Sequence, residues 1–134
     1  MREILFRATR LGDDEWVDGC LFVDDKGEKH EILIGYVNYR ISWEVDPDTI
    51  GQFTGLTDKN GKRIFEGDIV DHYVQGDLIV NRGVVFWDEK NAQWAHRLNT
   101  MKPNFYMYNS NAFEVIGNIH DNPELLGERE SHGE

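Results

Sequence analysis

Residues 54–70 read TGLTDKNGKRIFEGDIV, and this stretch decides how the second half of the chain folds. Its three glycines, Gly55, Gly61 and Gly67, are spaced six residues apart, which suits successive backbone turns and matches no nucleotide-binding loop. Asn60-Gly61 predicts a two-residue hairpin turn of type I′, because both residue types tolerate the positive φ that this turn requires. The stretch therefore predicts a run of turns that builds a sheet.

The hairpin predicted at Asn60-Gly61 leads directly into a further strand. Its short arms are residues 56–59 and 62–65, and Glu66-Gly67-Asp68 then turns the chain into IVDHYV. Asp68 is expected to accept backbone N–H bonds at this turn, since aspartate side chains commonly do so.

Apolar and polar residues alternate through most of the chain, which is the pattern of half-buried strands. Outside residues 54–70, strands are predicted in REILFRAT, WVDGCLFV, HEILIGYV, SWEVD, RGVVFWDEKNAQWAHRL (two strands) and AFEVIGNI. Many short strands separated by turn residues predict a mainly β protein of small antiparallel sheets, arranged as a sandwich or small barrel. Residues 99–111 fit either a packed loop or a short strand.

The predicted organisation has two subdomains and a tail. The N-terminal β subdomain covers residues 1–53, the second subdomain covers residues 54–126, and a disordered polar tail covers residues 127–134. A single helical turn is predicted in DNPELLG, with Asn122 as N-cap, Pro123 at the first helical position and Gly127 past the end.

The chain is acidic, with 25 acidic and 14 basic residues and a formal net charge of −11. The excess is spread over the whole length and forms no basic patch or acidic tail. Nonspecific DNA binding is disfavoured, because binding the DNA backbone needs clustered Lys and Arg. Solubility is the simplest reason for the charge, and a basic partner or DNA mimicry are alternatives.

The single cysteine, Cys20, excludes an internal disulfide and any zinc site built from several cysteines. It lies in WVDGCLFV, where it is predicted to be a small core residue. The sequence contains neither a signal peptide nor an apolar run of the roughly 20 residues that a membrane span needs. These observations predict a cytoplasmic protein.

Motifs that carry catalysis or cofactor binding are absent from the sequence. The spacing from Asp58 does not fit an EF-hand, and GxxxxGK[ST], GxGxxG, HExxH and GxSxG do not occur. His72 and His96 could meet on neighbouring strands, although most such histidines are ordinary strand residues. We therefore expect no catalytic residues, no metal site and no cofactor.

Large aromatic residues are the remaining candidates for recognition. Trp43 and Trp87 are predicted to be core residues. Trp94, Tyr106 and Tyr108 border predicted loops, so they form the candidate partner surface, on which a protein could anchor or a base could stack.

Two long motifs in the same order resemble the YopX family of phage and prophage proteins. These are WEVDPDTIGQFTGLTDKNGKRIFEGDIV and FEVIGNIHDNPELL, and the Ile4–Ala8 start (ILFRA) is also similar. The resemblance covers roughly residues 3–126, and DHYVQGDLIVNRG and MKPNFYMYNSN depart most from the family pattern.

The resemblance implies a β-rich fold whose C-terminal part is an SH3-like barrel beginning at EGDIV. It implies no established activity and offers no catalytic residues to carry over. The family-motif residues are interpreted as structural, with ligand binding by this segment as the alternative: Thr54, Gly55, Asp58, Asn60, Gly61, Gly67 and Asp68.

The leading functional hypothesis is a phage- or prophage-encoded, non-catalytic accessory protein in the bacterial cytoplasm. It would act by protein–protein contact or self-association. The alternatives are a nucleic-acid-binding protein in phage replication or regulation, and an acidic inhibitor that imitates DNA. Nucleic-acid binding would require a set of basic residues to converge on one face, namely Lys59, Lys62, Arg63, Arg82 and Arg97.

Overall fold

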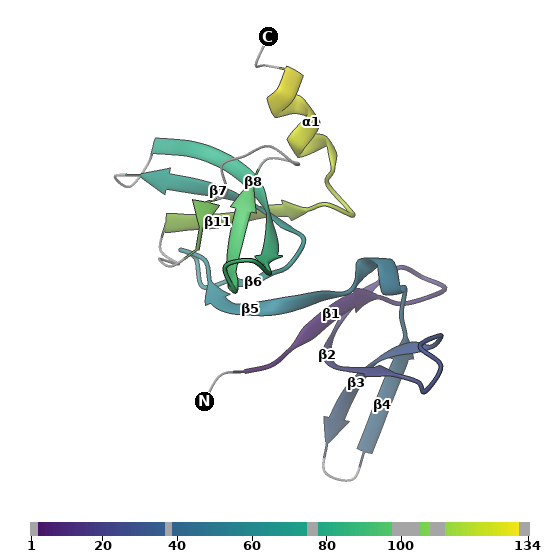
Figure 1. The fold of residues 1–134 in the computed structure, drawn as a ribbon. Helices are drawn as coiled ribbons and strands as arrows, with labels where there is room; N and C mark the ends of the chain where they lie inside the picture. The colour runs from purple at the N-terminus through teal and green to yellow at the C-terminus, as the bar shows by residue number, and fades with distance from the viewer. Residues whose placement is uncertain (1–2, 37–38, 75–77, 98–104, 108–111, 132–134) are drawn as a thin grey trace. The chain divides into compact units, whose positions relative to one another are not determined.

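The computed structural model describes residues 3–36, 39–74, 78–97, 105–107 and 112–131 (Figure 1). Contacts divide the chain into two compact units, Met1–Gly55 (unit 1) and Leu56–Glu134 (unit 2). The described strands pair antiparallel in two sheets, which confirms the predicted mainly β class.

Unit 1 is built on a hairpin-connected antiparallel sheet. Its strands are β1 (Phe6–Thr9), β2 (Trp16–Val23), β3 (His30–Tyr36), β4 (Tyr39–Glu44) and β5 (Gly51–Thr57), and a 3-10 turn, η1 (Pro47–Thr49), precedes β5. The hydrogen-bonded order is β4-β3-β2-β1-β5-β6, where β6 is Arg63–Phe65 and the last two residues of β5 belong to unit 2. The core of unit 1 is Ala8, Ile32 and Val45. These residues follow the alternation that the sequence shows.

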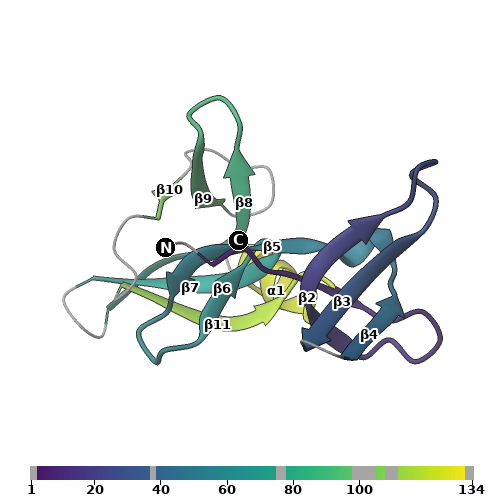
Figure 2. The same ribbon diagram turned by 90° about the horizontal axis from the view of Figure 1, so that it is seen from below.

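Unit 2 contains the second sheet and the helix. Its remaining elements are β7 (Asp68–Val74), β8 (Leu78–Asp88), β9 (Gln93–Arg97), β10 (Phe105–Tyr106), β11 (Phe113–Asn118) and α1 (Glu124–Ser131). The strand order is β10-β9-β8-β7-β11, and Figure 2 shows β8 and β9 as a hairpin with β10 beside β9. The buried core consists of Ile64, Val70, Val85, Met107 and Phe113.

The sheet of unit 2 is strongly curled. His96 on β9 and Phe113 on β11 have ring centroids only 5.4 Å apart, although two strands lie between them in the sheet. In a flat sheet these strands would be about 14 Å apart, because neighbouring strands are about 4.8 Å apart. The described residues show no pairing that closes the sheet, so an SH3-like barrel is not established by the strand order.

The turn between β5 and β6 differs from the type I′ turn that Asn60-Gly61 predicts. Only Gly61 has a positive φ, +85°. The Gly61 N–H donates to Asp58 O (3.0 Å) and the Asp58 N–H donates to Lys62 O (2.7 Å). This is a three-residue loop in which a type I turn is followed by a glycine bulge. The difference arises because the Asp58 carboxylate accepts the N–H of Asn60 and so holds Asn60 in an ordinary turn conformation.

We expect Gly61→Val to destabilise unit 2 by about 1 kcal/mol or more, because a β-branched residue is strained at positive φ. A Cβ at Gly61 would meet nothing within 4 Å, so the cost would come from the backbone alone. Thermal unfolding of the variant and the native chain measures this loss of stability. The matched control is Gly127→Ala in α1, also sterically open, where alanine should add up to about 1 kcal/mol. An unchanged melting temperature for Gly61→Val would contradict the positive φ.

The C-terminal helix is longer than the sequence pattern predicts. Gly127 lies inside α1 rather than past its end, and residues 127–131, predicted as disordered, belong to the helix. Glycine weakens a helix interior by about 1 kcal/mol but does not end it as proline does. None of the helices within the described ranges is long and apolar enough to cross a membrane.

Candidate functional site

Asp58 is the structural centre of the family-motif segment. Its side chain is only 4% exposed. Oδ1 accepts the N–H groups of Asn60 and Lys62, both at 2.9 Å, and Oδ2 accepts the N–H of Val115 on β11 at 3.0 Å. One buried carboxylate thus holds the β5–β6 turn closed and fastens it to β11.

The second turn of the motif, between β6 and β7, is also held by a buried aspartate. Gly67 has a φ of +90°, and Asp68 Oδ2 accepts the Phe65 N–H across this turn at 2.7 Å. Asp68 is buried, and the Gly67 N–H donates to Val85 O at 2.9 Å. The carboxylate therefore binds the backbone of its own turn.

Thr54 and Gly55 lie at the end of unit 1. Thr54 is buried, whereas Gly55 is exposed within β5 with a φ of +89°. Gly55 was predicted at a turn and instead lies inside a strand, where its positive φ marks an irregularity that only glycine adopts readily. All seven motif residues thus have a backbone or packing role in the structure.

A surface network joins the β5–β6 turn to β7 and β11. The Tyr73 hydroxyl donates to Glu114 Oε1 at 2.5 Å, and Asn60 Nδ2 donates to Glu114 Oε2 at 3.3 Å. Lys59 Nζ lies 3.8 Å from the Tyr73 ring centroid. The hydrogen bond to Glu114 raises the pKa of Tyr73 to about 12, so this hydroxyl stays protonated and is no general base near neutral pH.

Trp87 and Trp94 form the most prominent aromatic feature of unit 2. They are cross-strand partners on β8 and β9, and their rings meet edge to face at 5.1 Å. Trp94 packs against the core, while Trp87 is 41% exposed. The prediction that Trp87 is a core residue is therefore wrong, because its position at the hairpin end leaves one side of the ring without cover.

Tyr106 is held beside this hairpin by polar contacts. Asp88 Oδ2 accepts from the Tyr106 hydroxyl and from Asn91 Nδ2, both at 3.0 Å, and Asn91 Nδ2 also donates to the Tyr106 oxygen at 2.8 Å. The bond from Asn91 is the largest cause that lowers the pKa of Asp88. Of the candidate partner surface, the structure thus brings Trp94 and Tyr106 to one hairpin, and Tyr108 lies outside the described residues.

His72 and His96 do meet, but they lie on β7 and β9, which β8 separates, and not on neighbouring strands as predicted. Their ring centroids are 5.6 Å apart and nearly perpendicular, and His72 stacks on Phe113 at 4.7 Å. His72 Nδ1 and Asn81 Oδ1, on paired residues of β7 and β8, have no hydrogen-bond partner in the part of the chain that the structure describes. Burial lowers the pKa of His96 to about 4, so both rings face each other uncharged near neutral pH. Within the same residues, no group of three or more His, Cys, Asp or Glu could hold a metal ion.

The basic residues considered for nucleic-acid binding are partly engaged inside unit 2. Arg82 Nε bonds Asp71 Oδ1 at 2.7 Å and its NH1 donates to Leu125 O at 3.3 Å, which connects α1 to β8. Arg97 lies over the Phe86 ring at 4.5 Å. Lys62 and Arg63 are exposed on the β5–β6 hairpin.

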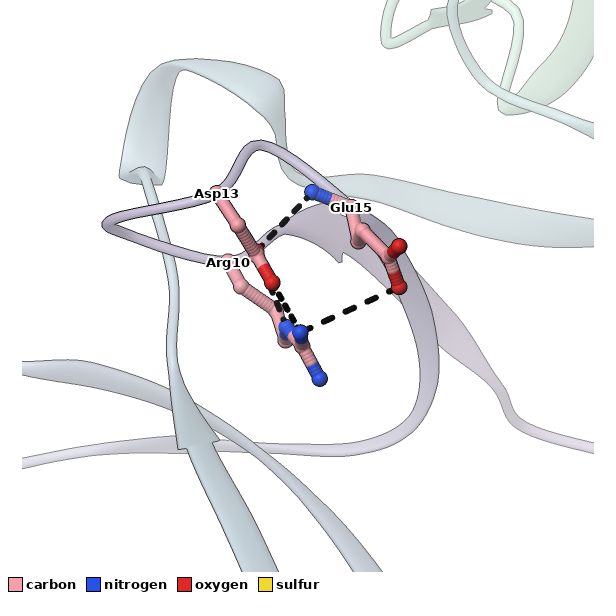
Figure 3. A network of polar contacts seen from close by, with 3 residues as sticks. All are labelled: Arg10, Asp13 and Glu15. Atoms are coloured by element: carbon pink, nitrogen blue, oxygen red, sulfur yellow. Dashed lines mark hydrogen bonds and ion pairs between the residues drawn. The ribbon is translucent and has the colours of Figure 1, made fainter.

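In unit 1, Figure 3 shows a network of polar contacts at the turn between β1 and β2. Arg10 Nε donates to Asp13 Oδ1 at 3.0 Å, a second Arg10 nitrogen bonds Asp13 Oδ2, and Glu15 Oε2 lies 3.8 Å away. These contacts, chiefly the bond from Arg10, lower the pKa of Asp13 to about 2. The Arg10 guanidinium also lies 4.1 Å from the ring centroid of Trp43. Trp43 is 37% exposed, so the prediction of a core residue is wrong here as well, because it sits on the outermost strand.

Cys20 is exposed, contrary to the predicted core position. Along β2, Val17 and Leu21 pack on the core, and the alternation of a strand directs Cys20 and Phe22 to the opposite face. Phe22 is 63% exposed and was not among the residues predicted for recognition. Phe22 lies on the same face of β2 as the polar residue Asp18, and this alternation in the sequence could have predicted its exposure.

Together, these contacts define a small antiparallel β protein in which the residues of the most distinctive sequence motif make turn and packing contacts. The family model described as YopX protein matches residues 5–127, and the chain belongs to this family. The crystal structure of protein EF1440 from Enterococcus faecalis is similar, with a TM-score of 0.56 and 26% sequence identity over 94% of this chain and 99% of that chain. A search of curated proteins gives no match.

Proposed function

We propose that the protein is a non-catalytic accessory protein that acts by protein–protein contact, with the Trp87 end of the β8–β9 hairpin as the contact surface. The observation that carries this proposal is the exposed Trp87 ring braced edge-on by Trp94. Tryptophan dominates binding energy at protein interfaces, and a ring already held by a neighbour loses little freedom on binding.

The surroundings of Trp87 support this role. The Asp88–Asn91–Tyr106 hydrogen bonds fix the turn next to it and tie β10 to the hairpin. A rigid platform favours specific recognition, because the partner does not have to order the surface. No cofactor enters this proposal, and we place the protein in the host cytoplasm, in the phage or prophage setting that the family resemblance implies.

We further propose that unit 2 is an SH3-like barrel. Two hydrogen bonds support closure of the curled sheet by the motif segment: the Lys59 N–H donates to Phe113 O at 2.9 Å, and the Gly67 N–H donates to Val85 O. These bonds join the β5–β6 hairpin to β11 and the β6–β7 turn to β8.

A pull-down with the tagged protein tests the function, using lysate of phage-infected or prophage-carrying cells with and without nuclease. We expect a protein that stays bound after nuclease and is lost with Trp87→Ser, because truncating a central tryptophan weakens binding about 30-fold or more. Leu11→Ser, which also removes an exposed apolar side chain, is the control that should bind normally. Loss of all bound material on nuclease treatment would instead indicate nucleic-acid binding, and capture that is indifferent to Trp87→Ser would contradict the proposed surface.

A further inference from the structure

One face of unit 1 carries an arrangement of side chains that the sheet does not use for its own core. The registers place Phe22, Glu31 and Glu44 in one row across β2, β3 and β4, and Cys20, Leu33 and Ser42 in the next. Ile32, which lies between Glu31 and Leu33 in the chain, is fully buried in the core. Because side chains alternate along a strand, these six residues lie on the opposite side of the sheet, and we call them the Phe22 face.

The Phe22 face is hollowed and partly apolar. Phe22, Glu31, Leu33 and Ser42 line a depression of about 230 Å³. A second depression also includes Phe22 and continues into the β2–β3 turn, where its other lining residues are Val23, Asp24, Asp25, Lys26 and Glu28. An aromatic ring that is exposed at the junction of two depressions is available to a partner from both sides.

Among the described residues that line the two depressions, Asp24, Asp25, Glu28 and Glu31 are acidic and Lys26 is basic. Glu31 and Glu44 are directly opposite each other on β3 and β4, a pairing of like charges that destabilises an antiparallel sheet. Ser42 Oγ donates to Glu31 Oε2 at 2.9 Å, which leaves the repulsion between the two carboxylates in place. In the turn, Asp24, Asp25 and Glu28 surround the single basic residue of that depression, Lys26. A cation bound between Glu31 and Glu44 would relieve this repulsion.

We propose that the Phe22 face binds an extended segment of a partner protein in which Arg or Lys stands two residues from an apolar residue, so that both side chains lie on the same side of the segment. An apolar side chain of the segment enters the depression between Phe22 and Leu33, and the cation two residues away contacts Glu31 and Glu44. Arginine suits the site best, since its planar guanidinium stacks on an aromatic ring and bonds carboxylates in a bidentate manner. A second copy of this chain, or a nucleic acid, would bring further negative charge to these carboxylates.

Fluorescence anisotropy with labelled peptides tests the proposal on the full chain. The probe is a short Arg–Leu peptide in which Arg and Leu take turns at every second position with Ser between them, and two matched peptides replace every Arg by Glu or every Leu by Ser. We expect the Arg–Leu peptide to bind with an affinity that falls with added salt, and both matched peptides to bind at least tenfold more weakly, since the site reads charge and apolar contact together.

Substitutions test whether the Arg–Leu peptide binds at the Phe22 face. Phe22→Ser should weaken the Arg–Leu peptide at least tenfold and Glu31→Gln severalfold, and both residues are peripheral enough to the core to leave the fold intact. Leu11→Ser and Glu89→Gln, an apolar and a carboxylate control at exposed turns, should bind normally. Equal binding by Phe22→Ser and the native chain would overturn the proposal, because attraction to the overall acidity would then account for the peptide.

Two further measurements show whether a second copy of the chain occupies the Phe22 face and whether this site is independent of the Trp87 surface. Concentration-dependent dimerisation that Phe22→Ser abolishes would overturn the proposal in favour of a second copy. Trp87→Ser should leave the peptide affinity unchanged, which separates this site from the Trp87 surface. If the peptide fails to bind while pull-down depends on Trp87, only the Phe22 proposal falls.

Discussion

Asp58→Ala should lower the free energy of unfolding of unit 2 by about 3–5 kcal/mol, the largest effect we expect from one exchange outside the apolar core. The substitution removes the acceptor for three backbone N–H groups, those of Asn60, Lys62 and Val115, at a position that is nearly inaccessible to water. Each donor then loses a bond to a charged group. Urea unfolding and hydrogen exchange at these three amides measure the loss.

Asp58→Asn separates the two contacts of the carboxylate, which closes the β5–β6 turn with one oxygen and binds β11 with the other. An asparagine keeps one oxygen for Asn60 and Lys62 but presents an NH2 group to the Val115 N–H, so we expect a loss of about 2 kcal/mol and faster exchange chiefly at Val115. The control is Asp24→Ala, because Asp24 Oδ1 accepts the Glu28 and Lys29 N–H groups at 2.8 and 3.0 Å in an exposed turn where water can replace it. A loss for Asp58→Ala no larger than for Asp24→Ala would contradict the role assigned to Asp58.

Acidification from pH 7 to pH 5 should destabilise unit 2 by about 2 kcal/mol through His96 alone. The pKa of His96 is about 4 in the folded chain because the ring is buried and faces His72, whereas an unfolded histidine has a pKa of about 6.5. The unfolded state therefore binds a proton first as the pH falls below about 6.5. The full stability is present above that pH, and the loss grows until the pH reaches the folded value, where it amounts to about 3 kcal/mol.

His96→Phe is the variant that isolates this effect, since it keeps an aromatic ring of similar size against Phe113 and cannot be protonated. Its stability should fall much less between pH 7 and pH 5, with a residual slope from His72, whose pKa is also lowered by burial. Asp13, Asp24 and Asp88 have lowered pKa values, so their contributions are present above about pH 4 and are lost only at lower pH. An equally steep loss in His96→Phe between pH 7 and pH 5 would show that another group governs it.

Much of the fold could be predicted from local chemistry. Gly61 and Gly67 were expected at turns, and both have positive φ values. A strand was expected in REILFRAT, and Ala8 and Phe6, which alternate in it, are a buried and a half-buried residue of unit 1. Such features depend on neighbours in the sequence, which is why a pattern of a few residues predicts them. The type of the turn at Asn60 was missed because Asp58, two residues earlier, competes for the backbone.

The candidate site could be predicted only in part, since exposure depends on which strands lie at the edges and ends of a sheet. Trp43 and Trp87 have the alternation of core residues, yet one lies on the outermost strand and the other at a hairpin end. The Phe22 face was missed for a related reason. The pairing of Glu31 with Glu44 arises from the register of β3 and β4, and no spacing along the chain reveals it.

The Asp58 carboxylate also depends on a partner that is synthesised much later than Asp58 itself. The bond that it accepts from Val115 spans 57 residues, so the hairpin at 58–62 emerges from the ribosome long before the donor that completes it. Until β11 follows, a charge destined for the interior must stay hydrated, and contacts so distant in sequence close slowly. Unit 2 should therefore fold late, and fragments that end before β11 should stay unfolded.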